Sequence, residues 1–181
     1  MCRFYVLKKN NVQRFPEILF PLEEDLEVRP GIKAPALMLS KAGELSMQEI
    51  PFGSFAREKT IYNARMETVL EKPFFQEAFL KRKAILPCSY FEESGMDGLP
   101  QRFYGDDVIF YLLGFARPDG FLLLTKPNDN KGKNAPPRMP CAIKKEGIVS
   151  YLSGSKSLQE CLASFQENLH INGGSEQLSL F

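Results

Sequence analysis

The central part of the chain consists of short apolar runs separated by turn-forming sequences. The runs cover residues 84–91, 102–104, 108–115, 121–125 and 141–143, and the turns include Gly105-Asp106-Asp107 and Arg117-Pro118-Asp119-Gly120. Short runs rich in β-branched and aromatic residues, bounded by Gly, Pro and Asp, are typical of strands in a sheet. The sequence therefore predicts a meandering sheet, in which strands that follow one another along the chain lie side by side.

Further strands and a few helices flank this region. Residues 4–7 predict a strand that begins almost at the first residue, which would hold the N-terminus in place. Residues 36–39 predict another strand, and residues 50–55 an extended segment around Gly53. Helices are expected at 11–20, at 74–83 after Pro73, and at 158–169, where apolar residues recur at helical spacing. The predicted fold class is α+β, mainly β.

The 181 residues fit one domain, with no internal repeat and no interdomain linker. We expect this domain to span residues 1–171. Residues 172–181 begin with Asn172-Gly173-Gly174-Ser175, a composition typical of a flexible tail.

The composition is that of a soluble globular protein, with 44% hydrophobic and 25% charged residues. No apolar run is long enough for a membrane-spanning helix. Polar residues such as Lys8 and Lys9 stand where a secretory signal needs an apolar core. We therefore expect a cytoplasmic monomer that is associated with the nucleoid when it binds DNA. The net charge is +1, so nucleic-acid binding would require a local basic strip.

The four cysteines are scattered and form no CxxC pair: Cys2, Cys88, Cys141 and Cys161. In a reducing compartment this pattern favours free thiols over disulfides or a metal site. Neither a metal nor an organic cofactor is expected.

Cys2 directly follows the initiator methionine. A small second residue normally permits removal of Met1, which would leave Cys2 with both a thiol and a free α-amino group. The α-amino pKa is only about 8, so part of the amine is an unprotonated nucleophile near neutral pH. Such an aminothiol attacks an aldehyde first through nitrogen, giving an imine, and then through sulfur, giving a thiazolidine. A cysteine beside the start codon carries little meaning alone, and its interpretation depends on the rest of the chain.

Four motifs supply that context. They are Met1-Cys2-Arg3-Phe4-Tyr5, Asn63-Ala64-Arg65-Met66-Glu67-Thr68, the segment 85–93 that ends in Glu92-Glu93, and Pro137-Arg138-Met139-Pro140. In this order and spacing the chain resembles the SRAP family of SOS-response-associated peptidases, or abasic-site processing proteins. The motif that begins at Asn63 is the most specific of the four.

The resemblance implies a single SRAP-type, barrel-like domain with flanking helices and a basic groove for single-stranded DNA. It implies that Cys2 forms a covalent link to the opened sugar of an abasic site. Asn63 would hold that sugar or the N-terminal amine, and Arg3, Arg65 and Arg138 would contact DNA. An acid after the aromatic pair would move protons.

The sequence is compatible with either Glu92 or Glu93 as this acid. Counting without gaps from Asn63 selects Glu93, whereas the family's aromatic–aromatic–Glu pattern selects Glu92. Neighbouring side chains of a strand point to opposite faces, so only one of the two would enter the site. Glu93 is our preferred assignment.

The chain departs from the family pattern at three places. Arg3 follows Cys2 where a glycine is usual. Ser94 stands where a tryptophan usually follows the acid, and Phe52 is a candidate to take over some of the base stacking. Pro136 replaces the usual histidine, and the chain's one histidine, His170, matches no family position. His170 is expected to be an ordinary surface or helix-end residue.

The chain ends in Gln177-Leu178-Ser179-Leu180-Phe181. This resembles the pentapeptide with which bacterial polymerases and repair proteins bind the replicative sliding clamp. Gln177 would supply amide hydrogen bonds, while Leu178, Leu180 and Phe181 would enter an apolar pocket. The alternative is a C-terminal strand packed against the core.

Together these features predict an enzyme-like sensor that crosslinks to abasic sites in single-stranded DNA and protects them during the DNA damage response. A self-directed removal of Met1 is the most that the peptidase label implies, because no Cys–His or GxSxG constellation is present. The alternative is a non-catalytic module that binds single-stranded DNA or the clamp and whose active site has decayed. A cysteine hydrolase is a third interpretation, disfavoured by the missing base.

Overall fold

A computed structural model describes residues 2, 4–13, 21–56, 59–129 and 134–171 of the protein. The strands are β1 (Phe4–Leu7), β2 (Leu26–Val28), β3 (Lys33–Leu39), β4 (Leu45–Pro51), β5 (Ser54–Ala56), β6 (Lys59–Ile61), β7 (Asn63–Arg65), β8 (Lys83–Cys88), β9 (Tyr90–Ser94), β10 (Pro100–Gly105), β11 (Phe110–Arg117), β12 (Gly120–Pro127), β13 (Arg138–Pro140), β14 (Ala142–Ile143) and β15 (Leu169–Ile171). The helices are α1 (Lys9–Val12), α2 (Pro73–Lys81), α3 (Ile148–Ser153) and α4 (Leu158–Phe165), and a 3-10 turn (Lys145–Gly147) precedes α3.

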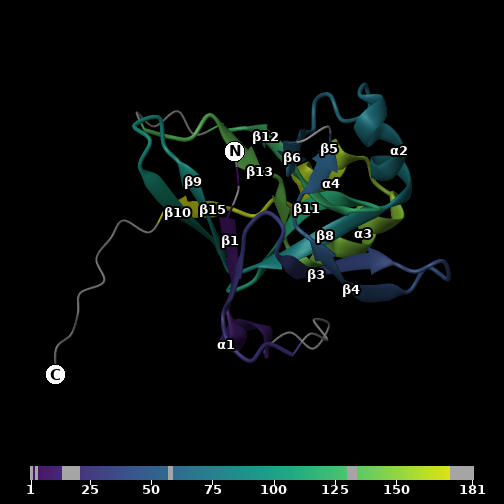
Figure 1. Cartoon of the computed structure of the whole chain (residues 1–181), viewed down its shortest axis with the longest axis horizontal. Coiled ribbons are helices and arrows are strands. Elements are labelled where there is room, and N and C mark those ends of the chain that lie inside the picture. Colours follow the sequence, from purple (N-terminus) through teal and green to yellow (C-terminus); the bar gives the residue numbers. More distant parts are fainter. Residues whose placement is uncertain (1, 3, 14–20, 57–58, 130–133, 172–181) are drawn as a thin grey trace.

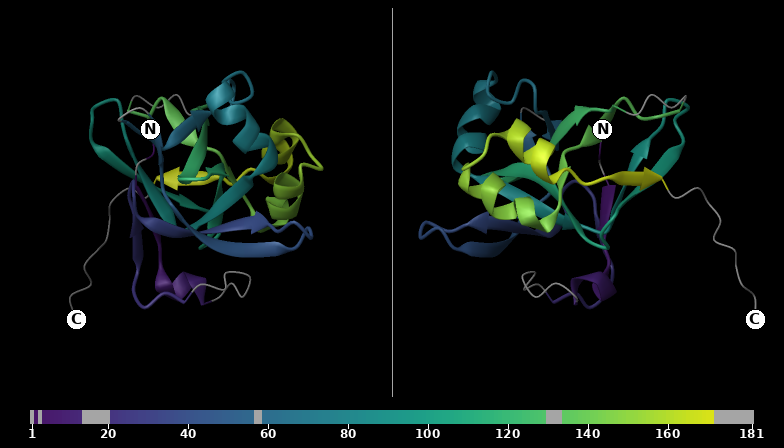
Figure 2. Two further views of the ribbon diagram at one scale, coloured as in Figure 1. Left: turned by 45° about the vertical axis from the view of Figure 1, so that its right-hand side comes forward. Right: turned by 180° about the vertical axis from the view of Figure 1, so that it is seen from behind.

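Two large sheets form the body of the domain. One has five antiparallel strands in the order β15-β10-β9-β1-β2. The other has eight strands, with a main path β13-β12-β11-β8-β3-β4; β14 joins at β11, and β7 pairs in parallel with β12. Figure 1 shows the five-stranded sheet to the left and helices α2, α3 and α4 to the right, with β8 and β11 between them, and the views in Figure 2 agree.

This architecture confirms the mainly β, α+β class but not the barrel-like closure. Among the described residues, the five-stranded sheet ends at β2 and β15, and the main path of the eight-stranded sheet ends at β13 and β4. No ring of strand pairs closes in this part of the chain. The expectation of a barrel is therefore replaced by two open sheets, packed face to face and covered by helices on one outer side.

Strand β11 explains why the core has two layers. Its side chains alternate between the two faces of the eight-stranded sheet. Tyr111, Leu113 and Phe115 pack with the helices in one apolar cluster. Phe110 and Leu112 pack with residues of the five-stranded sheet in the other. Because both faces are covered, β11 reads as a nearly continuous apolar run.

The chain passes from one large sheet to the other at Ser89, between β8 and β9. The Ser89 backbone N–H donates to Val6 O at 2.8 Å. Its hydroxyl oxygen accepts hydrogen bonds from the Lys8 backbone N–H and from Asn11 Nδ2, both at 3.0 Å. These contacts fix the direction in which β9 leaves the bend, and β9 carries both candidate acids.

The predicted helices are confirmed in part. Helix α2 begins at Pro73, buries Phe75 and Phe79, and ends at Lys81, two residues before its predicted end. The helix expected at 11–20 overlaps α1 only at residues 11 and 12, Gln13 is a turn residue, and 14–20 lie outside the described residues.

The helix expected at 158–169 begins as predicted, with a capping box between Ser157 and Glu160. Its expected end is wrong, because α4 stops at Phe165 and Leu169 begins β15. The side chains of Glu167 and Asn168 hydrogen-bond to Asp106 in the turn after β10. These contacts hold residues 167 and 168 against the turn after β10, and β15 follows at the edge of the five-stranded sheet.

Candidate functional site

Cys2 lies two residues before β1, inside the apolar layer between the two sheets. Its side chain is fully buried and packs in a cluster with Tyr5 and Phe91. The thiol donates a weak hydrogen bond to the backbone oxygen of Phe4 at 3.6 Å. Burial raises the pKa of the Cys2 thiol well above its ordinary value, and the nearby negative charge of Glu93 raises this pKa further. In this arrangement the thiol is protonated at neutral pH.

Asn63 meets Cys2 from a distant part of the sequence. It is the first residue of β7, which is held in the eight-stranded sheet by parallel pairing with β12. Asn63 Nδ2 donates a hydrogen bond to the backbone oxygen of Cys2 at 3.0 Å. Asn63 Oδ1 is buried and has no hydrogen-bond partner among the described residues. This acceptor is therefore available to a donor such as an N-terminal amine or a sugar hydroxyl.

Strand β9 separates the two candidate acids by the alternation of its side chains. Phe91 and Glu93 are buried on the inner face, where Phe91 stacks on Phe103 with ring centroids 5.2 Å apart. Glu92 pairs in register with Arg102 of β10 on the other face. Arg102 Nε and Nη2 donate to Glu92 Oε1 at 3.0 and 2.9 Å. Glu93 is thus the acid whose charge reaches the Cys2 thiol, and Glu92 is occupied by a surface ion pair.

A cavity of about 350 Å³ opens beside these residues. It is lined by both acids and by side chains from β1, the segments after β2 and β6, and the β9–β10 hairpin: Phe4, Arg29, Pro30, Tyr62, Glu92, Glu93, Ser94 and Pro100. The size is within the range of pockets that hold small ligands, roughly 300–1,000 Å³. Arg29 lies over the Phe4 ring, 4.4 Å from its centroid, with 62% of its side chain exposed. Its Nη2 also makes an exposed ion pair with Glu27 Oε2 at 3.5 Å, and the guanidinium lies at the cavity mouth.

Arg29, Phe4 and Tyr62 were not among the predicted site residues. Tyr62 directly precedes Asn63, and its ring makes an edge contact with Phe52 at a centroid distance of 6.1 Å. Its position beside the most specific motif is the one sequence signal that could have indicated it. Only the fold brings Arg29 to the cavity.

The predicted DNA-contact residues lie in different environments. Arg65 is exposed on β7. Phe52 is 1% exposed and packs edge-on against Tyr5 and Tyr62, so its ring offers no face for base stacking in this structure. Arg138 forms a bidentate ion pair with Glu67, with N–O distances of 2.8 and 2.7 Å. Arg3 and the tail residues Gln177, Leu178, Leu180 and Phe181 lie outside the described residues.

Ser94, the second departure from the family pattern, lines the cavity, whereas Pro136, the third, is not among the residues that line it. The backbone oxygen of Pro136 accepts a hydrogen bond from Asn128 Nδ2 at 2.9 Å. Of the two expected positions for His170, the surface one is confirmed: it is an exposed residue of the edge strand β15, not of a helix end, and its Nε2 contacts Asp106 Oδ1 at 2.5 Å. This contact lowers the pKa of the Asp106 carboxyl group. His170 thus contacts the turn after β10 through Asp106.

The described residues contain no group of three or more His, Cys, Asp or Glu side chains arranged to hold a metal ion. Within the same residues, no helix combines the length and the apolar character that crossing a membrane requires.

The geometry defines a class of protein: a mainly β domain with an N-terminal cysteine between two sheets, contacted by an asparagine and near a buried acid. The chain belongs to the SOS response associated peptidase (SRAP) family, whose sequence profile matches residues 17–177. The matched range includes Asn63, Glu93 and Arg138 but not Cys2, so the family assignment is independent of the cysteine. Family membership implies a function in processing abasic sites in DNA. No curated protein sequence gave a match.

Solved structures support the fold. A phage-related protein from Bordetella bronchiseptica matches with a TM-score of 0.67 and 15% identity, covering 96% of this chain and 95% of its own. A second protein from the same organism has a TM-score of 0.65 and 17% identity, with 84% and 88% covered. A protein from Bacteroides thetaiotaomicron has a TM-score of 0.58 and 19% identity, with 91% and 83% covered. At these identities the likeness concerns the fold alone.

Proposed function

We propose that the protein is a covalent sensor of abasic sites in single-stranded DNA. The observation that carries this proposal is the convergence of Asn63 and Glu93 on Cys2 beside a cavity. The first contact is a hydrogen bond to the Cys2 backbone, and the second is the effect of a buried carboxylate on its thiol. Residues so far apart in sequence meet at the one residue that combines an amine and a thiol once Met1 is removed.

The reaction needs only these groups and the aldehyde of an opened abasic sugar. The α-amine of Cys2 adds to the aldehyde carbon, and loss of one water gives an imine. The Cys2 sulfur then adds to the imine carbon, the thiol proton is transferred to the nitrogen, and a thiazolidine ring closes. No electrons are gained or lost, so no redox partner enters. The buried, protonated thiol has to give up its proton in the second step, and Glu93 is the base assigned to that transfer.

DNA contacts are assigned to groups near the cavity. Arg29 and Arg65 are exposed guanidinium groups suited to phosphate oxygens, and Arg3 keeps the same assignment from the sequence. Tyr62 and Phe4 line the cavity and are assigned the stacking role in place of Phe52, which is buried. Arg138 is ion-paired inside the protein, which makes it the weakest of the predicted phosphate contacts.

The test uses protein from which Met1 is shown by mass to be absent. It is mixed with single-stranded DNA carrying one abasic site, with intact DNA, and with DNA carrying a ring-closed abasic analogue that cannot open to an aldehyde. We expect a heat-stable shifted band on a denaturing gel with the first DNA alone. Equal non-covalent binding of all three, without a shifted band, would instead establish the non-catalytic binding module.

We further propose that residues 172–181 bind the replicative sliding clamp, as their resemblance to clamp-binding peptides implies. A peptide of these residues is expected to bind purified clamp, and a peptide with Leu180→Ala and Phe181→Ala is expected to lose at least about tenfold in affinity, since buried apolar anchors carry most of such binding energy. Isothermal calorimetry measures both. Absence of binding by the unaltered peptide would reject this partner.

A further inference from the structure

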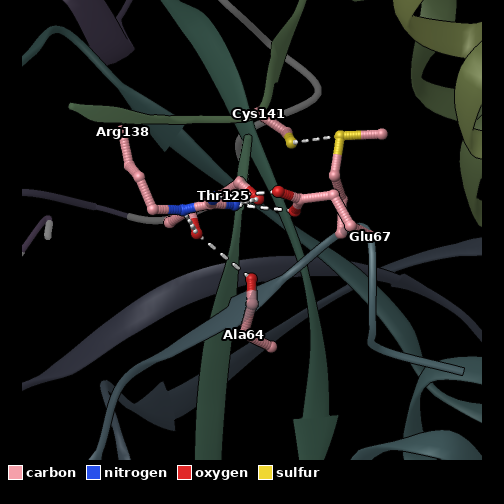
Figure 3. A network of polar contacts seen from close by, with 6 residues as sticks. Ala64, Glu67, Thr125, Arg138 and Cys141 are labelled. Carbon is pink, nitrogen blue, oxygen red and sulfur yellow. Dashed lines mark hydrogen bonds and ion pairs between the residues drawn. The ribbon is translucent and has the colours of Figure 1, made fainter. Parts of the chain in front are cut away.

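A network of polar contacts links the Asn63 motif to the strand that carries Arg138. Figure 3 shows Arg138 of β13 reaching Glu67, in the turn after β7, across Thr125 of β12. Nη1 and Nη2 of Arg138 donate to the two carboxylate oxygens of Glu67 at 2.8 and 2.7 Å. Nε donates to Thr125 Oγ1 at 3.2 Å, and Nη2 also donates to Thr125 O at 2.7 Å. The guanidinium thus ties β12 and β13 to this turn.

The same network reaches the residue that holds Cys2. Thr125 is fully buried, and its hydroxyl donates to Ala64 O at 3.4 Å. The Met66 backbone N–H donates to Thr125 O at 3.0 Å. Asn63 and Ala64 pair in register with Leu123 and Leu124 of β12. Strand β7 has only three residues, so contacts at its two ends largely determine where it lies.

The ion pair is well suited to fixing a position. Two parallel hydrogen bonds between a guanidinium and a carboxylate set direction as well as distance. Arg138 keeps 15% of its side chain exposed and Glu67 keeps 41%. The hydrogen bonds from Arg138 lower the pKa of the Glu67 carboxyl group, and the charges of Arg138 and Arg65 act in the same direction. The pair therefore remains ionised at neutral pH.

These contacts also account for the donors of Arg138. Its guanidinium makes four hydrogen bonds inside the protein, to Glu67 and Thr125. A phosphate would have to displace a carboxylate that is already bound in the preferred geometry. Arg65 of β7, a strand that also pairs with β12, is exposed and better placed for that role.

We propose that Glu67 and Arg138 are positioning residues: their ion pair fixes β7 so that Asn63 holds Cys2 in the reactive geometry. This inference rests on the proposed crosslinking function and deepens it. Arg138 acts through Glu67 and Asn63 rather than by gripping DNA, and Glu67 belongs to the site although it contacts neither thiol nor cavity.

The test measures two quantities for each variant: the crosslinking rate at saturating abasic DNA, and the affinity for intact single-stranded DNA at several salt concentrations. In Glu67→Gln, which keeps the shape but removes the charge, the rate is expected to fall by about tenfold or more, because displacing a reacting group by about 1 Å costs up to ~10²-fold. DNA affinity is expected to stay within about twofold and the salt slope to be unchanged. Glu71→Gln, an exposed acid near the same turn, is the matched control and should react like the unaltered protein.

The pair itself is tested by exchanging the charges, Glu67→Arg together with Arg138→Glu. The exchange is expected to recover part of the rate that Arg138→Gln alone loses. The Asn63 side-chain amide signals in an NMR spectrum provide a second readout, and they should shift in Glu67→Gln but not in Glu71→Gln. Thermal unfolding identifies any variant that fails to fold. If the charge-exchange variant does so, the Asn63 amide shift in Glu67→Gln decides whether the ion pair positions Asn63.

Two results would overturn the proposal. One is a crosslinking rate and an Asn63 amide signal in Glu67→Gln that match the unaltered protein. The other is weaker DNA binding in Arg138→Gln, with a salt slope reduced by about one charge, together with tighter binding in Glu67→Gln; this would assign Arg138 to a phosphate. If the unaltered protein forms no crosslink, the proposed function fails, while the Asn63 amide shift still judges the ion pair.

Discussion

Replacement of Cys2 by alanine is expected to abolish the heat-stable crosslink to abasic DNA. Alanine, like cysteine, permits removal of Met1, so Cys2→Ala keeps the α-amine and loses only the sulfur. The amine still forms an imine, but an imine without a neighbouring thiol hydrolyses, since no ring closes to hold it. We expect no shifted band on a denaturing gel, and a band that returns when borohydride is added to reduce the imine.

Cys2→Ser refines this expectation. The hydroxyl has nearly the geometry of the thiol but is a much weaker nucleophile near neutral pH. It should behave as Cys2→Ala does, with trapping by borohydride and no stable product. Cys161→Ala is the matched control, because Cys161 is also a buried thiol but lies in α4 and packs with the other core cluster. A heat-stable band that persists in Cys2→Ala would place the covalent link on another residue and remove the basis of the proposed mechanism.

The sequence predicts the sheet elements well where a strand's own residues determine it. β1 has the predicted bounds, and the runs at 108–115 and 121–125 correspond to β11 and β12. The run at 84–91 shows the limit of such predictions, because it is one apolar stretch that the fold divides at Ser89. The contacts that bend it come from Lys8 and Asn11, about eighty residues away. The residues around Ser89 in the sequence therefore give no indication of these long-range contacts.

The prediction of the candidate site has the same limit, because local motifs do not reveal long-range contacts. Motifs indicated Cys2, Asn63 and the acid pair, because each residue stands in a short recognisable segment. They gave no sign that Phe52 lies in the core or that Arg138 is held by Glu67, 71 positions away. Arg29 reaches the cavity only because β2 pairs with β1, which brings the following segment beside Phe4. Environment, rather than residue type, decides which of these side chains can meet a ligand.

The adjacent acids Glu93 and Glu92 offer the sharpest comparison within the site. Glu93→Gln is expected to slow crosslinking by roughly 10²–10⁴-fold, the usual contribution of a positioned proton-transfer group. Glu92→Gln is expected to leave the rate nearly unchanged, because Glu92 is engaged with Arg102 on the opposite face of β9. Loss of that partly exposed ion pair should cost at most about 1 kcal/mol of stability. Single-turnover gel assays of both variants measure the two rates, and thermal unfolding measures the stability.

The direction of the Glu93 effect separates two roles for its charge. The Glu93 carboxylate raises the pKa of the Cys2 thiol, so neutralising it should make the thiol more acidic. If Glu93 acted only through this field, Glu93→Gln would ease loss of the thiol proton and speed ring closure. If it carries the proton, the same variant loses the acceptor and reacts more slowly although the thiol pKa has fallen. The crosslinking rate therefore decides the matter: a slower reaction in Glu93→Gln identifies Glu93 as the proton carrier, and a faster reaction rejects that role.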